Sequence, residues 1–291
     1  MNQVKMACVC VFLVIGWLAA PAGAVDFSFW DITVVDSIDY GGGFTSLAIL
    51  PSGQPAISYY DFTTKDIKYA WYDGSTWQTE VVDSTGTGYG GGFTSLAILP
   101  SGQPAISYSD ATAKLKYAWY DGSNWQTEVV DSSATYGNTS LAILPSGQPA
   151  ISYYDYTTKV IKYTWYDGST WQTEVVDSTG TGYGGGVTSL AILPSGQPAI
   201  SYSDYTNKNI NYAWYDGSNW QTEVVDSSAT YGDGLTSLAI LPSGQPAISY
   251  SVSVYDSDLR YTWYDGNTWQ ATTVDIVGHS MSLAVLPSGQ Q

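Results

Sequence analysis

The motif PSGQ recurs six times along this chain, beginning at Pro51, Pro100, Pro145, Pro194, Pro242 and Pro287. By subtraction, successive copies are 49, 45, 49, 48 and 45 residues apart. Each repeat holds four strand-like runs, and a period in the forties with four strands is typical of the blades of a β-propeller. Because the motifs recur in every copy, none of them can supply the unique nucleophile or base of a single active site. Functional residues are therefore sought where the repeats vary.

Within the first full repeat, the four runs are separated by turn signals. Pro51, Ser52 and Gly53 form a turn cluster, and the Asp73-Gly74 dipeptide indicates a hairpin. The fourth run, WQTEVV, alternates between polar and apolar residues, whereas the earlier runs have the composition of strands buried on both faces. We therefore expect four antiparallel strands ordered from innermost to outermost along the chain, near Leu47, Ile57, Tyr69 and Val81.

The N-terminal 24 residues have the features of a secretory signal peptide. A cation at Lys5 precedes an apolar run of about 15 residues, shorter than the roughly 20 that a membrane span needs, and Ala22 and Ala24 form an A-x-A cleavage pattern. Residues 1–24 are thus predicted to be removed, and both cysteines, Cys8 and Cys10, with them. Residues 25–291 are predicted to form one propeller domain in a protein that is secreted, periplasmic or on the cell surface.

The charge of the chain is strongly negative: 26 acidic residues face nine basic ones, a formal net charge of −17. Nucleic acid and anionic membrane surfaces are poor partners for such a protein, and no membrane insertion is expected after signal cleavage. The acidic residues are spread evenly over the repeats, which favours a role in the solubility of an exported surface.

The two ends of the repeat region predict a blade that is split. The first run, WDITVVDS at residues 30–37, matches an outer strand, and the chain stops at PSGQQ just after an inner strand. We expect five complete blades plus a split sixth whose two middle strands are missing, which predicts that the chain is a fragment truncated at its C-terminus.

The ISYYD and WYDGSTW segments resemble the repeats of secreted bacterial β-propeller proteins, from about Trp30 to the C-terminus. The turn from Asp73 to Trp77 is also distantly similar to the Asp-box of sialidase-type propellers, and the repeats to lectin-type propellers. Asp and Trp are four residues apart here, whereas the Asp-box pattern has five. In that family the box is a structural turn. The resemblance implies the propeller architecture and no particular activity.

The composition argues against an enzyme. Sialidase chemistry uses three arginines, and Arg260 is the only one; His279 is the only histidine, too few for a metal cluster. Pairs such as Glu80 with Asp83 recur in other repeats, so no unsymmetrical acid and base stand out. We expect no catalytic residue, no metal ligand and no cofactor. Three repeated aspartates could ligate calcium, but without a D-x-D-x-D-G spacing turn capping is favoured; these are Asp61, Asp155 and Asp204.

The connections between blades are rich in glycine and each contains a tyrosine that precedes a glycine. These predicted ligand-binding residues are Tyr40, Tyr89, Tyr136, Tyr183 and Tyr231, with His279 beside Gly278 in the last loop. If these loops share a face, the rings form a crown on which sugars stack, with Asn138 and Asp233 near enough to bond hydroxyls. The alternative is that each tyrosine folds back to seal the groove between blades.

Two functions follow from these two roles of the tyrosines. The first is an exported, multivalent, lectin-like propeller that binds a glycan or cell-surface polysaccharide. The second is a structural or protein-protein interaction module of a larger exported protein, which has another exported protein as its partner and no catalytic activity.

Overall fold

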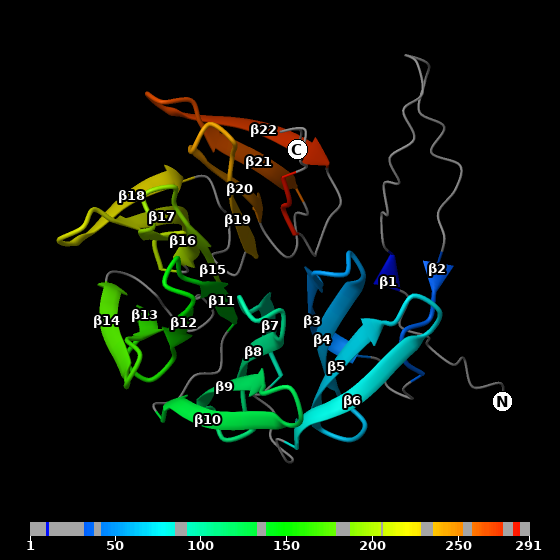
Figure 1. Cartoon of the computed structure of the whole chain (residues 1–291). Helices are drawn as coiled ribbons and strands as arrows, with labels where there is room; N and C mark the ends of the chain where they lie inside the picture. The colour runs from blue at the N-terminus through cyan, green and yellow to red at the C-terminus, as the bar shows by residue number, and fades with distance from the viewer. Residues whose placement is uncertain are drawn as a thin grey trace, which may run out of the picture.

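The computed structural model describes residues 10–11, 32–37, 42–84, 92–132, 138–178, 187–204, 206–227, 235–252, 258–275 and 282–285. Its strands form five antiparallel four-stranded sheets, which Figure 1 shows arranged around a common centre. Within each sheet the strands are hydrogen-bonded in chain order. The predicted propeller with five complete blades is therefore confirmed, and the sheets are called blades one to five here in chain order.

The first strands carry the TSLAI run and are β3 (Gly42–Ile49), β7 (Thr94–Ile98), β11 (Thr139–Ile143), β15 (Thr188–Ile192) and β19 (Thr236–Ile240). The second strands begin at the proline of the QPAISY run and are β4 (Pro55–Asp61), β8 (Pro104–Ser109), β12 (Pro149–Asp155), β16 (Pro198–Asp204) and β20 (Pro246–Ser251).

The third strands end on an aromatic pair and are β5 (Asp66–Tyr72), β9 (Leu115–Tyr120), β13 (Val160–Tyr166), β17 (Asn209–Tyr215) and β21 (Leu259–Tyr264). The fourth strands begin at a tryptophan and are β6 (Trp77–Ser84), β10 (Trp125–Asp131), β14 (Trp171–Asp177), β18 (Trp220–Asp226) and β22 (Trp269–Asp275). The first strands of blades one to five contact one another in turn around the centre, and the fourth strands lie at the rim (Figure 1). The expected order from innermost to outermost is confirmed.

The turn between the third and fourth strands forms because aspartate caps it. In blade one, Asp73 Oδ1 accepts hydrogen bonds from the backbone N–H groups of Ser75 and Thr76, each at 2.8 Å. Gly74 has φ of +97°, a left-handed conformation that glycine adopts without strain. Gln78 Nε2 donates to the second carboxylate oxygen at 2.9 Å. The aspartate that resembles the Asp-box residue is thus a turn-capping group.

The apolar core lies between neighbouring blades. Ile161 and Tyr163 of blade three pack with Ile200 and Tyr202 of blade four in one cluster of buried side chains, and comparable clusters join the other consecutive blades. The expected face-to-face packing is confirmed, with Tyr69 and its equivalents in blades two to four in the core, whereas Tyr261 of blade five is only half-buried. Each blade interface therefore brings together residues about one repeat apart in the chain.

Burial does not fall steadily from the first strand to the fourth, as the sequence had led us to expect. The second strands are buried at almost every position, whereas the first strands of blades two to five alternate between buried and half-buried residues. The reason is that one face of each first strand borders the central cavity. In blade one, β3 has no buried residue over 43–49 and exposes Leu47 and Ile49. The expectation of burial on both faces is thus right for the second strands and wrong for the first. The half-exposed fourth strands agree with their alternating sequence.

The segment 32–37 lies against blade one in the way a fourth strand lies against the next blade. Trp77 Nε1 donates to Thr33 Oγ1 at 3.2 Å, and Tyr59 Oη donates to Asp36 Oδ2 at 2.6 Å. At the other end, the N–H of Leu283 donates to Ser237 Oγ at 2.9 Å, the contact that first strands make elsewhere. The described residues contain no sixth four-stranded sheet, so the split sixth blade stays a prediction.

One short sheet lies outside the blades. β1 (Cys10–Val11) pairs in antiparallel fashion with β2 (Ile32–Thr33), and β1 falls within the predicted signal peptide. In the described part of the chain, no helix has the length and apolarity needed to cross a bilayer. Cleavage after Ala24 remains a prediction.

Candidate functional site

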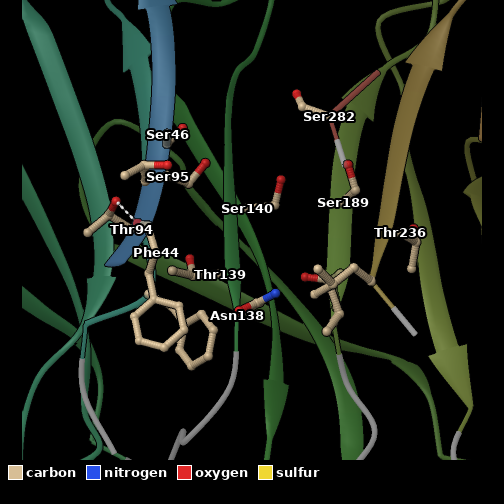
Figure 2. Close-up of a pocket in the computed structure, with 15 residues that line it drawn as sticks. Phe44, Ser46, Thr94, Ser95, Asn138, Thr139, Ser140, Ser189, Thr236 and Ser282 are labelled. Atoms are coloured by element: carbon tan, nitrogen blue, oxygen red, sulfur yellow. Dashed lines mark hydrogen bonds between the residues drawn. The ribbon is translucent and has the colours of Figure 1, made fainter. Parts of the chain in front are cut away.

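A cavity of about 670 Å³ occupies the centre of the propeller, where the first strands meet (Figure 2). Its lining is a ring of serine and threonine hydroxyls, with Phe44 and Phe93 closing one side at a ring-centroid separation of 3.8 Å. Asn138 also lines it, and its buried Oδ1 has no hydrogen-bond partner. No lining residue is ionisable, so the cavity offers no acid or base.

Many of the hydroxyls that line this cavity are already used in joining the blades. Ser46 Oγ accepts the N–H of Leu96 at 3.0 Å, and Ser95 Oγ accepts the N–H of Leu141 at 2.9 Å. Thr94 Oγ1 donates to the carbonyl of Phe44 at 2.7 Å. Because these groups hold neighbouring first strands together, much of their hydrogen-bonding capacity is already used, and a second kind of cavity offers a better candidate.

That second cavity, of about 300 Å³, is a cleft between blades two and three. Tyr117 and Trp119 on β9 and Glu128 on β10 form one wall. The opposite wall comes from Gln148 in the β11–β12 turn, Tyr166 at the end of β13 and Trp171 at the start of β14. The cleft thus combines four aromatic rings with one carboxylate and one amide.

The geometry of this cleft leaves hydrogen-bonding capacity available. Trp171 Nε1 donates to Glu128 Oε1 at 2.8 Å, while Glu128 Oε2 has no protein donor among the described residues. Tyr117 stacks on Trp119 with centroids 5.5 Å apart and meets Trp171 edge-on at 5.4 Å. Burial, followed by the nearby charge of Glu128, raises the pKa of Tyr117 well above its ordinary value. The phenol therefore remains protonated.

The same contact joins each further pair of consecutive blades. The indole N–H donates across the interface in Trp125 to Glu80 at 2.7 Å, Trp220 to Glu174 at 3.2 Å and Trp269 to Glu223 at 2.8 Å. In each case a tyrosine and a tryptophan of the third strand stack beside this contact. Four equivalent combinations of aromatic rings and a carboxylate therefore surround the propeller.

The predicted crown residues Tyr40, Tyr89, Tyr136, Tyr183 and Tyr231 all lie outside the described residues, as does His279. Their loops join a fourth strand to the next first strand. The cleft lies at the opposite end of the strands, where the PSGQ and Asp-Gly turns are, because antiparallel strands place alternate connections at opposite ends. The cleft was not predicted from the sequence; the signal that could have found it is the glutamate three residues after the fourth-strand tryptophan in blades one to four.

The repeated ionisable side chains of the described residues take part in structural contacts. No group of three or more His, Cys, Asp or Glu side chains comes together within them. The repeated glutamates are indole acceptors, and the single arginine, Arg260, pairs with Asp226 at 2.8 Å. Asp61 Oδ1 accepts the N–H groups of Thr63 and Thr64, so the predicted turn capping is confirmed.

No protein-family model and no curated relative matches this chain. Solved structures do resemble it. AofleA from Arthrobotrys oligospora superimposes with a TM-score of 0.59 at 10% identity, covering 89% of this chain and 82% of that one. The fucose-specific lectin from Aleuria aurantia gives 0.57 at 17% identity, with 79% and 77% covered. SapL1 lectin, solved in complex with alpha methyl fucoside, gives 0.56 at 18% identity, with 79% and 82% covered. These likenesses establish that the chain has the fold of lectin β-propellers.

Proposed function

We propose that this protein is an exported, non-catalytic propeller that binds carbohydrate at several equivalent clefts between its blades. The observation that carries the proposal is the cleft between blades two and three, in which two tryptophans and two tyrosines surround a glutamate whose second oxygen is available. The same indole-glutamate contact recurs at the other three interfaces. Aromatic faces pack against the C–H face of a sugar ring, and a carboxylate accepts hydrogen bonds from its hydroxyl groups. Solved lectins of the same fold support the proposal.

The charge of the protein limits the class of sugar. Each cleft carries a carboxylate, and the whole chain has a formal net charge of −17. Sialic and uronic acids would be repelled, so the expected ligands are neutral glycans on a cell surface or a polysaccharide. A shallow cleft buries little area, and we expect each site to bind at about −4 kcal/mol, near millimolar. Several sites acting together raise the avidity by roughly 10² to 10⁴.

The test begins with a glycan array probed with the full chain, followed by retention on the best immobilised glycan. Replacing both Glu128→Gln and Glu174→Gln keeps an acceptor oxygen for Trp171 and Trp220 but removes two charges that face the sugar. Retention should fall at least threefold. Asp66→Asn, at the opposite end of a third strand, is the control for lost charge and should leave retention unchanged. Binding to no neutral glycan, or full retention by the double variant, would refute the proposal.

A second function is supported by a different observation. Each fourth strand exposes one valine at its outer face, with exposed fractions of 49, 48, 53, 52 and 59% at Val81, Val129, Val175, Val224 and Val274. Such a regular apolar row favours an interaction scaffold that binds another exported protein. Replacing Val129 and Val175 with threonine should then weaken capture of that partner and leave glycan retention unaltered.

A further inference from the structure

Every interface from blade one to blade five contains the same polar network. An aspartate from the neighbouring outer strand accepts the hydroxyl of a second-strand tyrosine, as in Tyr108 to Asp83 at 2.6 Å and Tyr153 to Asp131 at 2.5 Å. In four blades, the third-strand residue that is in register with that tyrosine is a cation. These residues are Lys68, Lys116, Lys162 and Arg260, in register with Tyr59, Tyr108, Tyr153 and Tyr250.

In two of these blades the ammonium group lies between two carboxylates. Lys162 Nζ is 2.7 Å from Asp155 Oδ2 and 3.2 Å from Asp131 Oδ2. Lys68 Nζ is likewise 2.8 Å from Asp61 Oδ2 and 3.1 Å from Asp36 Oδ2. An aspartate at the end of the second strand and one on the neighbouring outer strand thus converge on a single positive charge.

Blade four keeps both carboxylates and has no cation at the third-strand position. Tyr202 Oη donates to Asp177 Oδ2 at 2.5 Å, and Asp204 ends β16 as Asp155 ends β12. The residue in register with Tyr202, however, is Asn211. Asparagine is shorter than lysine and carries no charge. Asn211 therefore places no ammonium group between the two carboxylates, where blades one and three have one.

Two details of blade four indicate which group occupies the position of the missing ammonium. Asn211 is 6% exposed, and its buried Oδ1, on the same side of the sheet as Tyr202, has no hydrogen-bond partner. Asp204 is 1% exposed; it accepts the N–H groups of Thr206 and Asn207 and the amide of Asn207 but makes no ion pair within the described residues. The three N–H donors satisfy the oxygens of Asp204 but do not neutralise its charge. A buried carboxylate without an opposite charge and a buried oxygen without a donor are both unfavourable.

We propose that the interface between blades three and four binds one calcium ion, with Asp177, Asp204 and the amide oxygen of Asn211 as its protein ligands. Calcium prefers carboxylate and amide oxygens, tolerates irregular geometry and completes its shell with water. Two carboxylates match a divalent ion, whereas the ammonium of the other blades carries one charge. The ion replaces the missing lysine, so this site is structural and is independent of the glycan clefts.

The test uses the full chain after treatment with a chelator. Isothermal titration with calcium chloride should give one site per chain with a dissociation constant of about 10⁻⁴ to 10⁻³ M, as in other extracellular modules. The melting temperature should rise with calcium concentration, since the ion binds only the folded state. No bound calcium, or an equal rise with potassium chloride at matched ionic strength, would overturn the proposal.

Two variants locate the site, because the other repeats supply the controls. Asn211→Lys restores the ammonium of blades one and three; it should abolish calcium binding and raise the melting temperature in the absence of calcium. Lys162→Asn recreates the blade-four arrangement in blade three and should raise the stoichiometry from one calcium to two. A calcium response that persists in the Asn211→Lys variant places the ion elsewhere and refutes the assignment.

Discussion

Tyr108 Oη lies 2.6 Å from Asp83 Oδ2 and ties the second strand of blade two to the outer strand of blade one. Burial, and then the hydrogen bond and charge of Asp83, raise the pKa of Tyr108 well above its ordinary value. The hydroxyl therefore keeps its proton and remains a donor. Lys116 Nζ contacts the same carboxylate oxygen. This three-residue contact joins residues that are 25 to 33 positions apart in the chain.

Replacing Tyr108→Phe should lower the free energy of unfolding by about 1.5 to 3 kcal/mol, because a hydrogen bond to a charged group is lost inside a blade interface. Urea denaturation followed by tryptophan fluorescence measures the change. The matched control is Tyr72→Phe, whose exposed hydroxyl donates to the carbonyl of Ser75 at 3.1 Å and should matter by less than about 0.5 kcal/mol. Equal effects of the two variants would contradict the role given to Tyr108.

The buried hydroxyl pair of Ser58 and Thr94 predicts that the effects of two substitutions on the free energy of unfolding are not additive. Ser58 Oγ donates to Thr94 Oγ1 at 2.8 Å, and both side chains are buried. Thr94→Val keeps the shape but leaves the Ser58 hydroxyl unpaired, so the free energy of unfolding should fall by about 1 to 3 kcal/mol. Ser58→Ala in the same chain removes that orphan group, and the double variant should be no less stable than Thr94→Val alone. Additive losses in a double-mutant cycle would rule out the coupling.

The capping aspartates predict that acid destabilises the fold. Backbone N–H donors, first that of Thr76 and then that of Ser75, hold the pKa of Asp73 below its usual range, and the same holds for Asp121, Asp167, Asp216 and Asp265. The unfolded chain therefore takes up protons at a higher pH than the folded one. Stability is fully present above about pH 4 and falls as pH drops toward the folded pKa values.

Urea denaturation at a series of pH values between 7 and 2 measures this dependence. Asp73→Asn retains an acceptor oxygen for the turn but has no proton to gain, so its stability should vary less with pH than that of the unchanged chain. An identical pH dependence in the variant would show that this turn does not contribute.

The tyrosine crown gives a prediction for the opposite face of the propeller. Replacing Tyr89→Ala together with Tyr183→Ala should weaken retention on an immobilised glycan and leave the melting temperature unchanged, because rings on glycine-rich loops contribute stacking faces and little packing. Thermal unfolding and glycan retention are measured on the same preparation. A large drop in melting temperature would instead assign these tyrosines to sealing the grooves between blades.

Most of the architecture could be predicted from the chain because its signals are local. The alternation within WQTEVV, the Asp73-Gly74 turn and the PSGQ spacing each depend on residues that are neighbours in sequence. Few folds accommodate a repeat of this length with four such strands. The amphipathic pattern of the fourth run indicated that it is the outer strand and so gave the order from centre to rim. Even the outer-strand character of residues 30–37 was visible in the sequence, and Thr33 and Asp36 make the corresponding contacts.

The candidate sites could not be predicted in this way, because each is made by two repeats. Glu128 and Trp171 are 43 residues apart, and only the packing of blade two against blade three brings the carboxylate to the indole N–H. In the sequence, Asn211 is an ordinary variation between repeats. Its register with Tyr202, together with the carboxylates that surround the equivalent lysine in blade three, is what indicates a cation at this position. Sequence alone thus determined the strands, their turns and their order. The tertiary structure decided which side chains of different repeats meet, because burial and charge pairing act across the blade interfaces.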